Sequence, residues 1–143
     1  SLRRLVSDLK INNIDILEPV PLTEMPQKLE TAYAALVTLK DLSLFKGTRP
    51  AKMMAPLAAG LPIVYSGAGE GADIVKDTSA GLVTPPEDER ALADAVMWLA
   101  DHPQDASIMG KQGRKFAEDH LDWNVLVKNW LNDVQKCLLK KGN

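Results

Sequence analysis

The sequence predicts an α/β fold with a Rossmann-like parallel sheet and flanking helices, ending in an all-helical segment. Two observations support this prediction. Short apolar runs alternate with amphipathic segments in the first part of the chain, and only helical periodicity remains from Glu87 onward. With 143 residues, 45% of them apolar and 25% charged, the chain has the composition of one globular domain, 1–143, in which 87–143 is the helical part.

The first predicted elements are an amphipathic helix, a strand, a second helix and a second strand. Apolar residues recur at helical spacing until Asn12, and a short apolar run at 14–17 then predicts a strand. Thr23 is suited to cap a helix that runs to about residue 32. Residues 35–39 are apolar on both faces, which is typical of a buried parallel strand.

The stretch 49–71 holds the features on which the functional prediction depends. Pro50 suits the first turn of a short helix that ends at Gly60, and a strand is predicted over 62–66. Three glycines in the turn that follows, at 66–71, allow the backbone to approach a ligand closely. Because ligands of open α/β sheets lie beyond the carboxyl ends of the strands, we expect a binding site at this turn.

A short helix at 72–76 and a last strand at 81–84 are predicted next. Three longer amphipathic helices follow, the first at 87–100, the second from Pro103 and the third at 123–139. The lone Cys137 excludes an intrachain disulfide and is expected to be a small core residue. Trp98, Trp123 and Trp130 occupy helical positions and are expected to serve packing.

Composition also excludes several classes of function. The net charge of −2 and the absence of a concentrated basic tract argue against nucleic acid as a partner. No apolar run approaches the roughly 20 residues that a membrane span needs. His102 and His120 are isolated, so no metal site is predicted. A lone cysteine and the lack of a signal-peptide pattern favour a cytoplasmic location.

Four stretches follow one another between Leu44 and Trp123: LFKGTRPAKMMAPLAAGLPIV, SGAGEGADIV, SAGLVTPPEDERALADAV and IMGKQGRKFAEDHLDW. Together they resemble the C-terminal nucleotide-sugar-binding domain of GT-B glycosyltransferases of family 4 (group 1), in particular the Pro-x-Lys subgroup of surface-polysaccharide biosynthesis. The resemblance implies the donor-binding half of a retaining glycosyltransferase that transfers a sugar from a UDP- or GDP-sugar to a glycan or lipid-linked acceptor.

The same resemblance implies a fragment of a two-domain enzyme that lacks the first βα units of this domain. Its partners would then be the nucleotide-sugar donor and an acceptor-binding N-terminal domain. The isolated chain is expected to be inactive and to expose an apolar flank of its sheet. Peripheral association of the whole enzyme with the inner face of the membrane is left open.

The residues and the resemblance together assign donor binding to seven positions: Arg49, Lys52, Gly67, Gly69, Glu70, Gly71 and Asp73. Main-chain N–H groups of the glycine turn and the following helix start would face a diphosphate, and the ammonium of Lys52 would add positive charge. Simpler interpretations stay open: a tight turn for the glycines, a solvated lysine, and helix capping by the two carboxylates. No catalytic residue and no metal are assigned. No cofactor is assigned either, because the nucleotide sugar is the substrate of the reaction.

One departure from the family pattern weakens this interpretation. The two glutamates of the family's E-x7-E motif align with Gly47 and Ala55, so both carboxylates are absent. The second one usually holds the ribose hydroxyls, and the methyl group of Ala55 forms no hydrogen bond. The alternative is therefore a degenerate, non-catalytic domain of the same fold that serves as an interaction module. A sugar-nucleotide epimerase would need further His and acidic residues that this sequence does not show.

Overall fold

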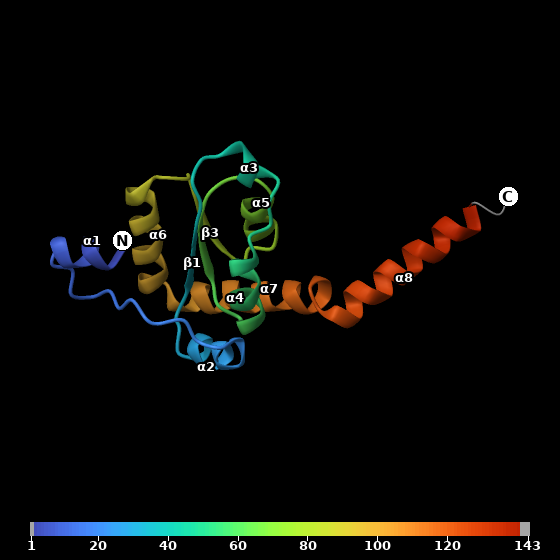
Figure 1. The fold of residues 1–143 in the computed structure, drawn as a ribbon, viewed down its shortest axis with the longest axis horizontal. Helices are drawn as coiled ribbons and strands as arrows, with labels where there is room; N and C mark the ends of the chain where they lie inside the picture. The colour runs from blue at the N-terminus through green and yellow to red at the C-terminus, as the bar shows by residue number, and fades with distance from the viewer. Residues whose placement is uncertain (1, 141–143) are drawn as a thin grey trace.

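A computed structural model describes residues 2–140 and shows a sheet with helices on both faces (Figure 1). Within these residues the sheet has three strands in the order β1 (Ala35–Thr38), β2 (Ile63–Ser66) and β3 (Gly81–Thr84). Both pairings are parallel, and Val64 lies between Leu36 and Leu82 in the register. Helices connect successive strands, so the predicted Rossmann-like α/β class is confirmed.

The described residues also form eight α-helices and two 3-10 turns. The α-helices are α1 (Leu2–Asp8), α2 (Met25–Glu30), α3 (Ser43–Lys46), α4 (Met54–Ala59), α5 (Glu70–Asp77), α6 (Glu89–Asp101), α7 (Pro103–His120) and α8 (Trp123–Lys140). The 3-10 turns are η1 (Leu22–Glu24) and η2 (Ala51–Met53). None of these described helices is long and apolar enough to cross a membrane.

The strand predicted at 14–17 is wrong. Residues 11–20 contain neither helix nor strand. A strand exists only where a neighbouring strand completes its backbone hydrogen bonds, and the sheet of the described residues offers none to this segment. The segment between β1 and Arg49 contains the short helix α3. The other strands form within a residue of their predicted positions.

The core lies on both faces of β2, whose residues are all buried. On one face, Ile63 and Tyr65 pack with buried residues of η2, α4, α5 and α7: Met53, Leu57, Val75 and Ala117. On the other face, Val64 packs with Ala95, Leu99 and Ala106 from α6 and α7. This double cover explains why a continuous apolar run marks the central strand.

The two faces of β1 differ, because this strand is at the edge of the described sheet. Val37 is buried against η2 and α4, whereas Leu36 on the opposite face is 55% exposed. Leu36 pairs in register with Val64, which α6 and α7 cover completely. The expected exposed apolar flank of the sheet is therefore present at Leu36.

Helices α4 and α7 cross closely because glycines remove side chains from their contact. A Cβ atom added at Gly110 would overlap the carbonyl oxygen of Gly60, the left-handed residue (φ 75°) that ends α4. A Cβ atom added at Gly113 would lie 2.9 Å from Cδ2 of Leu57. Two glycines three residues apart on α7 thus place one face of this helix directly against α4.

Helix α8 projects away from the sheet (Figure 1). Its aromatic residues Trp123 and Trp130 are 77% and 64% exposed, so they do not pack on the described core. The expectation that Cys137 is a core residue is wrong, because this thiol is exposed. The amphipathic pattern predicted the helix correctly, but no described element covers its apolar face. Trp98, on α6, instead stacks on His102 with ring centroids 4.2 Å apart.

Candidate functional site

The segments that follow β1 and β2 meet at the carboxyl edge of the sheet. The first contains α3 and leads to Arg49 and Lys52, and the second is the glycine turn that opens α5. The two segments touch, because a Cβ atom added at Gly69 would overlap backbone atoms of Lys46. Figure 1 shows α3 and the start of α5 at the same end of the strands. The structure therefore brings the predicted donor-binding segments together.

Arg49 and Glu70 form an ion pair across these two segments. The Nε and Nη2 groups of Arg49 both donate to Oε1 of Glu70, at 3.0 Å and 2.5 Å. Each side chain is 44% exposed, so the pair is open to solvent on one side. Glu70 is the first residue of α5, where the helix dipole also favours a negative charge.

Lys52 is held at the end of β1. Its Nζ donates a hydrogen bond of 2.8 Å to the carbonyl oxygen of Thr38, the last residue of that strand. Since an ammonium group has three N–H donors, this bond leaves capacity for an anion. The carbonyl partner is neutral, so Lys52 keeps its full positive charge at this edge of the sheet.

The three glycines of the turn each have a reason within the fold. Gly69 has a φ of +85° and lies against Lys46. Cβ atoms added at Gly67 and Gly71 would meet the ring of Tyr65, at 2.9 Å from Cε1 and 2.8 Å from Cζ. The interpretation of these glycines as a tight turn thus accounts for all three without a ligand. Gly67 and Gly71 are buried, whereas the middle of the turn, at 68–70, is partly accessible to solvent.

The start of α5 has no side-chain cap, because its N-cap residue is Gly69. The first N–H groups of a helix have no partner within the helix and are suited to an anion. The carboxylate of Glu70 bonds to Arg49, and no hydrogen bond among the described residues joins the side chain of Asp73 to these N–H groups. The capping role considered for both carboxylates is therefore not observed in the structure.

Tyr65 is buried directly beneath this turn. Its side chain is completely buried, and its hydroxyl has no hydrogen-bond partner among the described residues. Burial raises the pKa of Tyr65, and the negative charge of nearby Asp73 raises this pKa further. The phenol consequently stays neutral at physiological pH. The sequence indicated this residue only as part of a buried strand, so its role under the glycines was missed.

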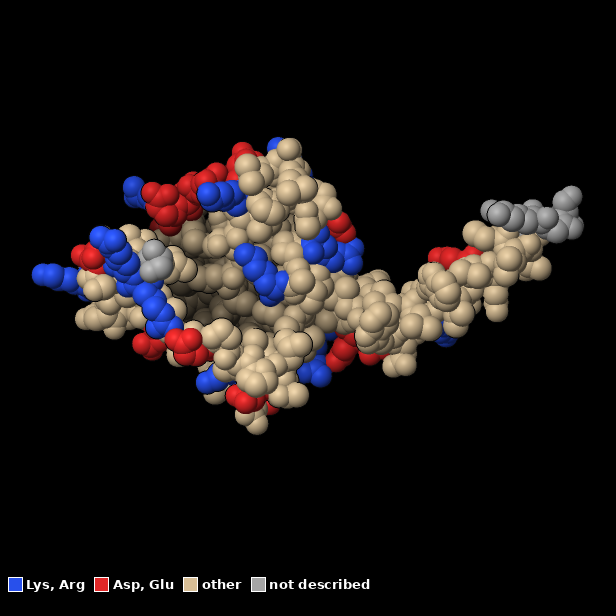
Figure 2. Space-filling model, in the orientation of Figure 1, with Lys and Arg blue, Asp and Glu red and all other residues tan. Residues whose placement is uncertain are grey.

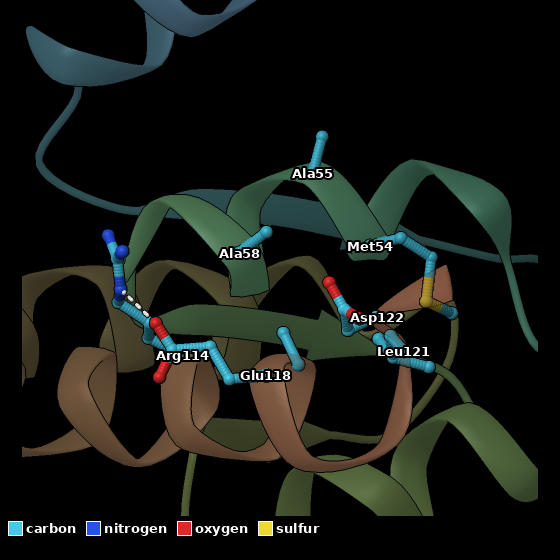
Figure 3. A pocket seen from close by; sticks show the side chains of 8 residues that line it. Met54, Ala55, Ala58, Arg114, Glu118, Leu121 and Asp122 are labelled. Atoms are coloured by element: carbon cyan, nitrogen blue, oxygen red, sulfur yellow. Dashed lines mark hydrogen bonds and ion pairs between the residues drawn. The ribbon is translucent and has the colours of Figure 1, made fainter. Parts of the chain in front are cut away.

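A hollow of about 450 Å³ lies between α4 and the last turns of α7 (Figure 3). Its wall includes Ala55, where the family pattern has its ribose-binding glutamate, and Arg114, which is paired with Glu118 at 2.8 Å. Gly47 ends α3 and contributes no side chain. The structure therefore offers no carboxylate at either family position.

A second hollow, which the sequence did not predict, lies at the carboxyl edge on the face covered by α6. It has a volume of about 590 Å³ and is bordered by Thr38, Lys40, Ser66 and the acidic residues that precede and begin α6. Figure 2 shows acidic side chains gathered over the start of α6. Glu87 has a φ of 59° and accepts a hydrogen bond of 3.2 Å from the backbone N–H of Asp41. The run of acidic residues at 87–89, which follows β3 after two prolines, was the available signal.

The described residues contain no group of three His, Cys, Asp or Glu side chains that is placed to hold a metal ion. Around the glycine turn, the hydrogen-bond donors at the carboxyl edge are Arg49, Lys52 and the first N–H groups of α5. Such an arrangement is suited to bind an anion through hydrogen bonds and charge.

Comparisons with known proteins point in the same direction. The family model described as "Glycosyl transferases group 1" matches residues 1–102. The chain is 34% identical to "Sucrose-phosphate synthase 4" of Arabidopsis thaliana over 80 residues. These 80 residues are 56% of this chain and 8% of that protein. The solved sucrose-phosphate synthase from Thermosynechococcus elongatus has the same fold, with a TM-score of 0.82 and 18% identity over 97% of this chain and 34% of that chain. This chain belongs to the group 1 glycosyl transferases.

Proposed function

We propose that this chain is the donor-binding part of a retaining glycosyltransferase of family 4 and its Pro-x-Lys subgroup. The enzyme would transfer a hexose from a UDP- or GDP-sugar to a glycan or lipid-linked acceptor. The observation that carries the proposal is the meeting of Arg49, Lys52 and the uncapped start of α5 at the carboxyl edge of the sheet. Membership of the glycosyl transferase family supports it.

In this proposal the chain contributes orientation and charge to the reaction. The leaving nucleoside diphosphate gains negative charge as the bond to the sugar breaks. Lys52, the guanidinium of Arg49 and the N–H groups of α5 would face the phosphate oxygens, since each is a donor that suits this charge. The acceptor would be held by another domain. The chain covers 8% of the length of its curated relative, so activity of the whole enzyme belongs to this proposal.

Calorimetric titration with UDP, GDP and inorganic pyrophosphate tests the proposal. The natural chain is expected to bind all three, and Lys52→Ala is expected to weaken each because it removes a charged donor from the phosphate site. The matched control is Lys111→Ala. Lys111 is exposed on α7 and borders a hollow with Tyr33 and Pro62, at the opposite ends of the strands. Equal weakening by both variants would contradict a phosphate site at Lys52.

A second candidate function is a non-catalytic interaction module of the same fold. It is favoured by the absence of a carboxylate at Ala55 and by the packing roles of the three glycines. The exposed apolar residues of α8 also fit a surface that contacts another protein. Failure of the natural chain and all of its variants to bind any of the three phosphate ligands would favour this function over donor binding.

A further inference from the structure

Arg49 directs one edge of its guanidinium group, formed by Nε and Nη2, at a single carboxylate oxygen of Glu70. This is one of the two edges through which arginine recognises carboxylate and phosphate groups with two parallel hydrogen bonds. An anion that approaches Arg49 through the same edge must therefore take the place of Glu70. The ion pair and an anion complex at this edge of Arg49 exclude each other.

We propose that Glu70 is an internal competitor for Arg49, and that a nucleoside diphosphate binds by displacing its carboxylate from the guanidinium. Glu70 thereby sets the affinity of the site for diphosphate. This inference rests on the proposed function, because it concerns the same donor site. It deepens that function by assigning opposite roles to two residues that the sequence grouped together as donor-binding.

The surroundings of the pair favour such an exchange. Both side chains are 44% exposed, so neither charge is left buried when the partners separate. Lys52 does not face this competition, since its partner is the neutral carbonyl of Thr38. Exposed ion pairs are weak, and their strength corresponds to at most about a fivefold change in a binding constant. A diphosphate carries more charge than a carboxylate and meets Lys52 and the helix start as well.

A double-mutant cycle tests the competition directly. The natural chain, Glu70→Gln, Arg49→Gln and the double variant are titrated with inorganic pyrophosphate by calorimetry at one ionic strength. We expect Glu70→Gln to tighten binding about two- to fivefold, because the amide pairs less strongly with Arg49. We expect Arg49→Gln to weaken binding. The effect of Glu70→Gln should vanish when Arg49 is already replaced.

The matched control is Glu118→Gln. Glu118 accepts from Nε of Arg114 at 2.8 Å on the exposed surface of α7, so the variant breaks the same kind of pair elsewhere. It should leave pyrophosphate binding unchanged. Circular dichroism confirms that each variant is folded. The three replaced side chains are 44% exposed or more, so we expect the fold to be retained in every variant.

The outcomes separate this inference from the proposed function. Equal tightening by Glu70→Gln in both backgrounds would show a general charge effect at the helix start and would overturn the competition. No change, or weaker binding, in Glu70→Gln would also overturn it, while binding by the natural chain would still support the donor site. Absence of pyrophosphate, UDP and GDP binding in every variant would contradict the donor site itself, and the competition would fall with it.

Discussion

The ring of Tyr65 lies directly beneath Gly71. A Cβ atom added at Gly71 would lie 2.8 Å from Cζ of this ring and would overlap the hydroxyl oxygen. Tyr65 belongs to the central strand and Gly71 to the first turn of α5, so this contact sets the height of the glycine turn above the sheet. The geometry of the candidate donor site therefore depends on a buried residue that no ligand would touch.

We predict that Gly71→Ala destabilises the protein. The new methyl group would meet Tyr65 and also Cδ of Pro50, 2.9 Å away, and overpacking of this kind costs roughly 1–3 kcal/mol. Chemical denaturation gives the free energy of unfolding. Gly47→Ala is the control, because a Cβ atom there has no neighbour within 4 Å. Equal stability of the two variants would contradict the packing role of Gly71.

The buried phenol of Tyr65 predicts a dependence of stability on alkaline pH. Its pKa is raised by burial and by Asp73, so the folded protein keeps this proton at a pH where the unfolded chain loses it. The resulting stabilisation is complete below the ordinary pKa of 10.0 and is lost as the pH rises above it through the folded value. Tyr65→Phe removes this component, so its unfolding free energy should decline less between about pH 9 and 11. Parallel curves for the two proteins would contradict a perturbed Tyr65.

The sheet and the meeting of its loops were predictable from sequence, because both follow from local patterns and from parallel topology. Apolar runs bounded by turn residues located β1, β2 and β3, and parallel strands necessarily bring their following loops to one edge. The absence of a strand at 14–17 could not be predicted in the same way. Whether such an apolar run forms a strand depends on a neighbouring strand, which is a property of the assembled sheet rather than of the segment.

Which side chains pair with each other could not be predicted from the sequence either. Arg49 and Glu70 are 21 positions apart, and each is long, exposed and free to choose among rotamers, so no pattern indicates that they pair. The glycines were read as space for a ligand, whereas Gly67 and Gly71 make space for Tyr65. For α8, amphipathic spacing predicted an apolar face, but a periodic pattern does not say which element covers it.

Because β1 lies at the edge of the described sheet, truncation to Ala should cost less free energy of unfolding on β1 than at the paired position on β2. Leu36 and Val64 are paired, but only Val64 is buried. We expect Leu36→Ala to change the free energy of unfolding by no more than about 0.5 kcal/mol, as for other surface substitutions. Val64→Ala should cost roughly 2 kcal/mol or more, because it leaves a cavity against Leu99 and Ala106. Denaturation curves that give a large cost at Leu36 would show that the described edge is covered in solution.

The close crossing of α4 and α7 predicts that Gly110→Ala is strongly destabilising. Its methyl group would overlap the carbonyl oxygen of Gly60, and a backbone atom cannot move aside as a flexible side chain does. We expect a loss of roughly 3 kcal/mol, at the upper end of the range for overpacking. Ser107→Ala, on an exposed position of the same helix, is the control and should retain the natural melting temperature. A normal melting temperature of Gly110→Ala would contradict the crossing.

Restoring the family's second carboxylate tests whether its loss weakened donor binding. We predict that Ala55→Glu tightens UDP and GDP but not pyrophosphate, because a carboxylate in the first turn of α4 would accept hydrogen bonds from ribose hydroxyls. A charged hydrogen bond is worth roughly 1.5–3 kcal/mol, which is about one to two powers of ten in affinity. Pyrophosphate has no ribose and serves as the internal reference in the same calorimetric titrations.

The control for this variant is Ala58→Glu. Ala58 borders the same hollow as Ala55 but lies one turn further along α4, away from the carboxyl edge (Figure 3). Both variants add one negative charge to a hollow that Arg114 also borders, so a general charge effect would act on both. Selective tightening of nucleoside diphosphates by Ala55→Glu alone would locate the ribose at the start of α4. Equal behaviour of the two variants would contradict that location and would leave the phosphates as the whole of donor recognition by this chain.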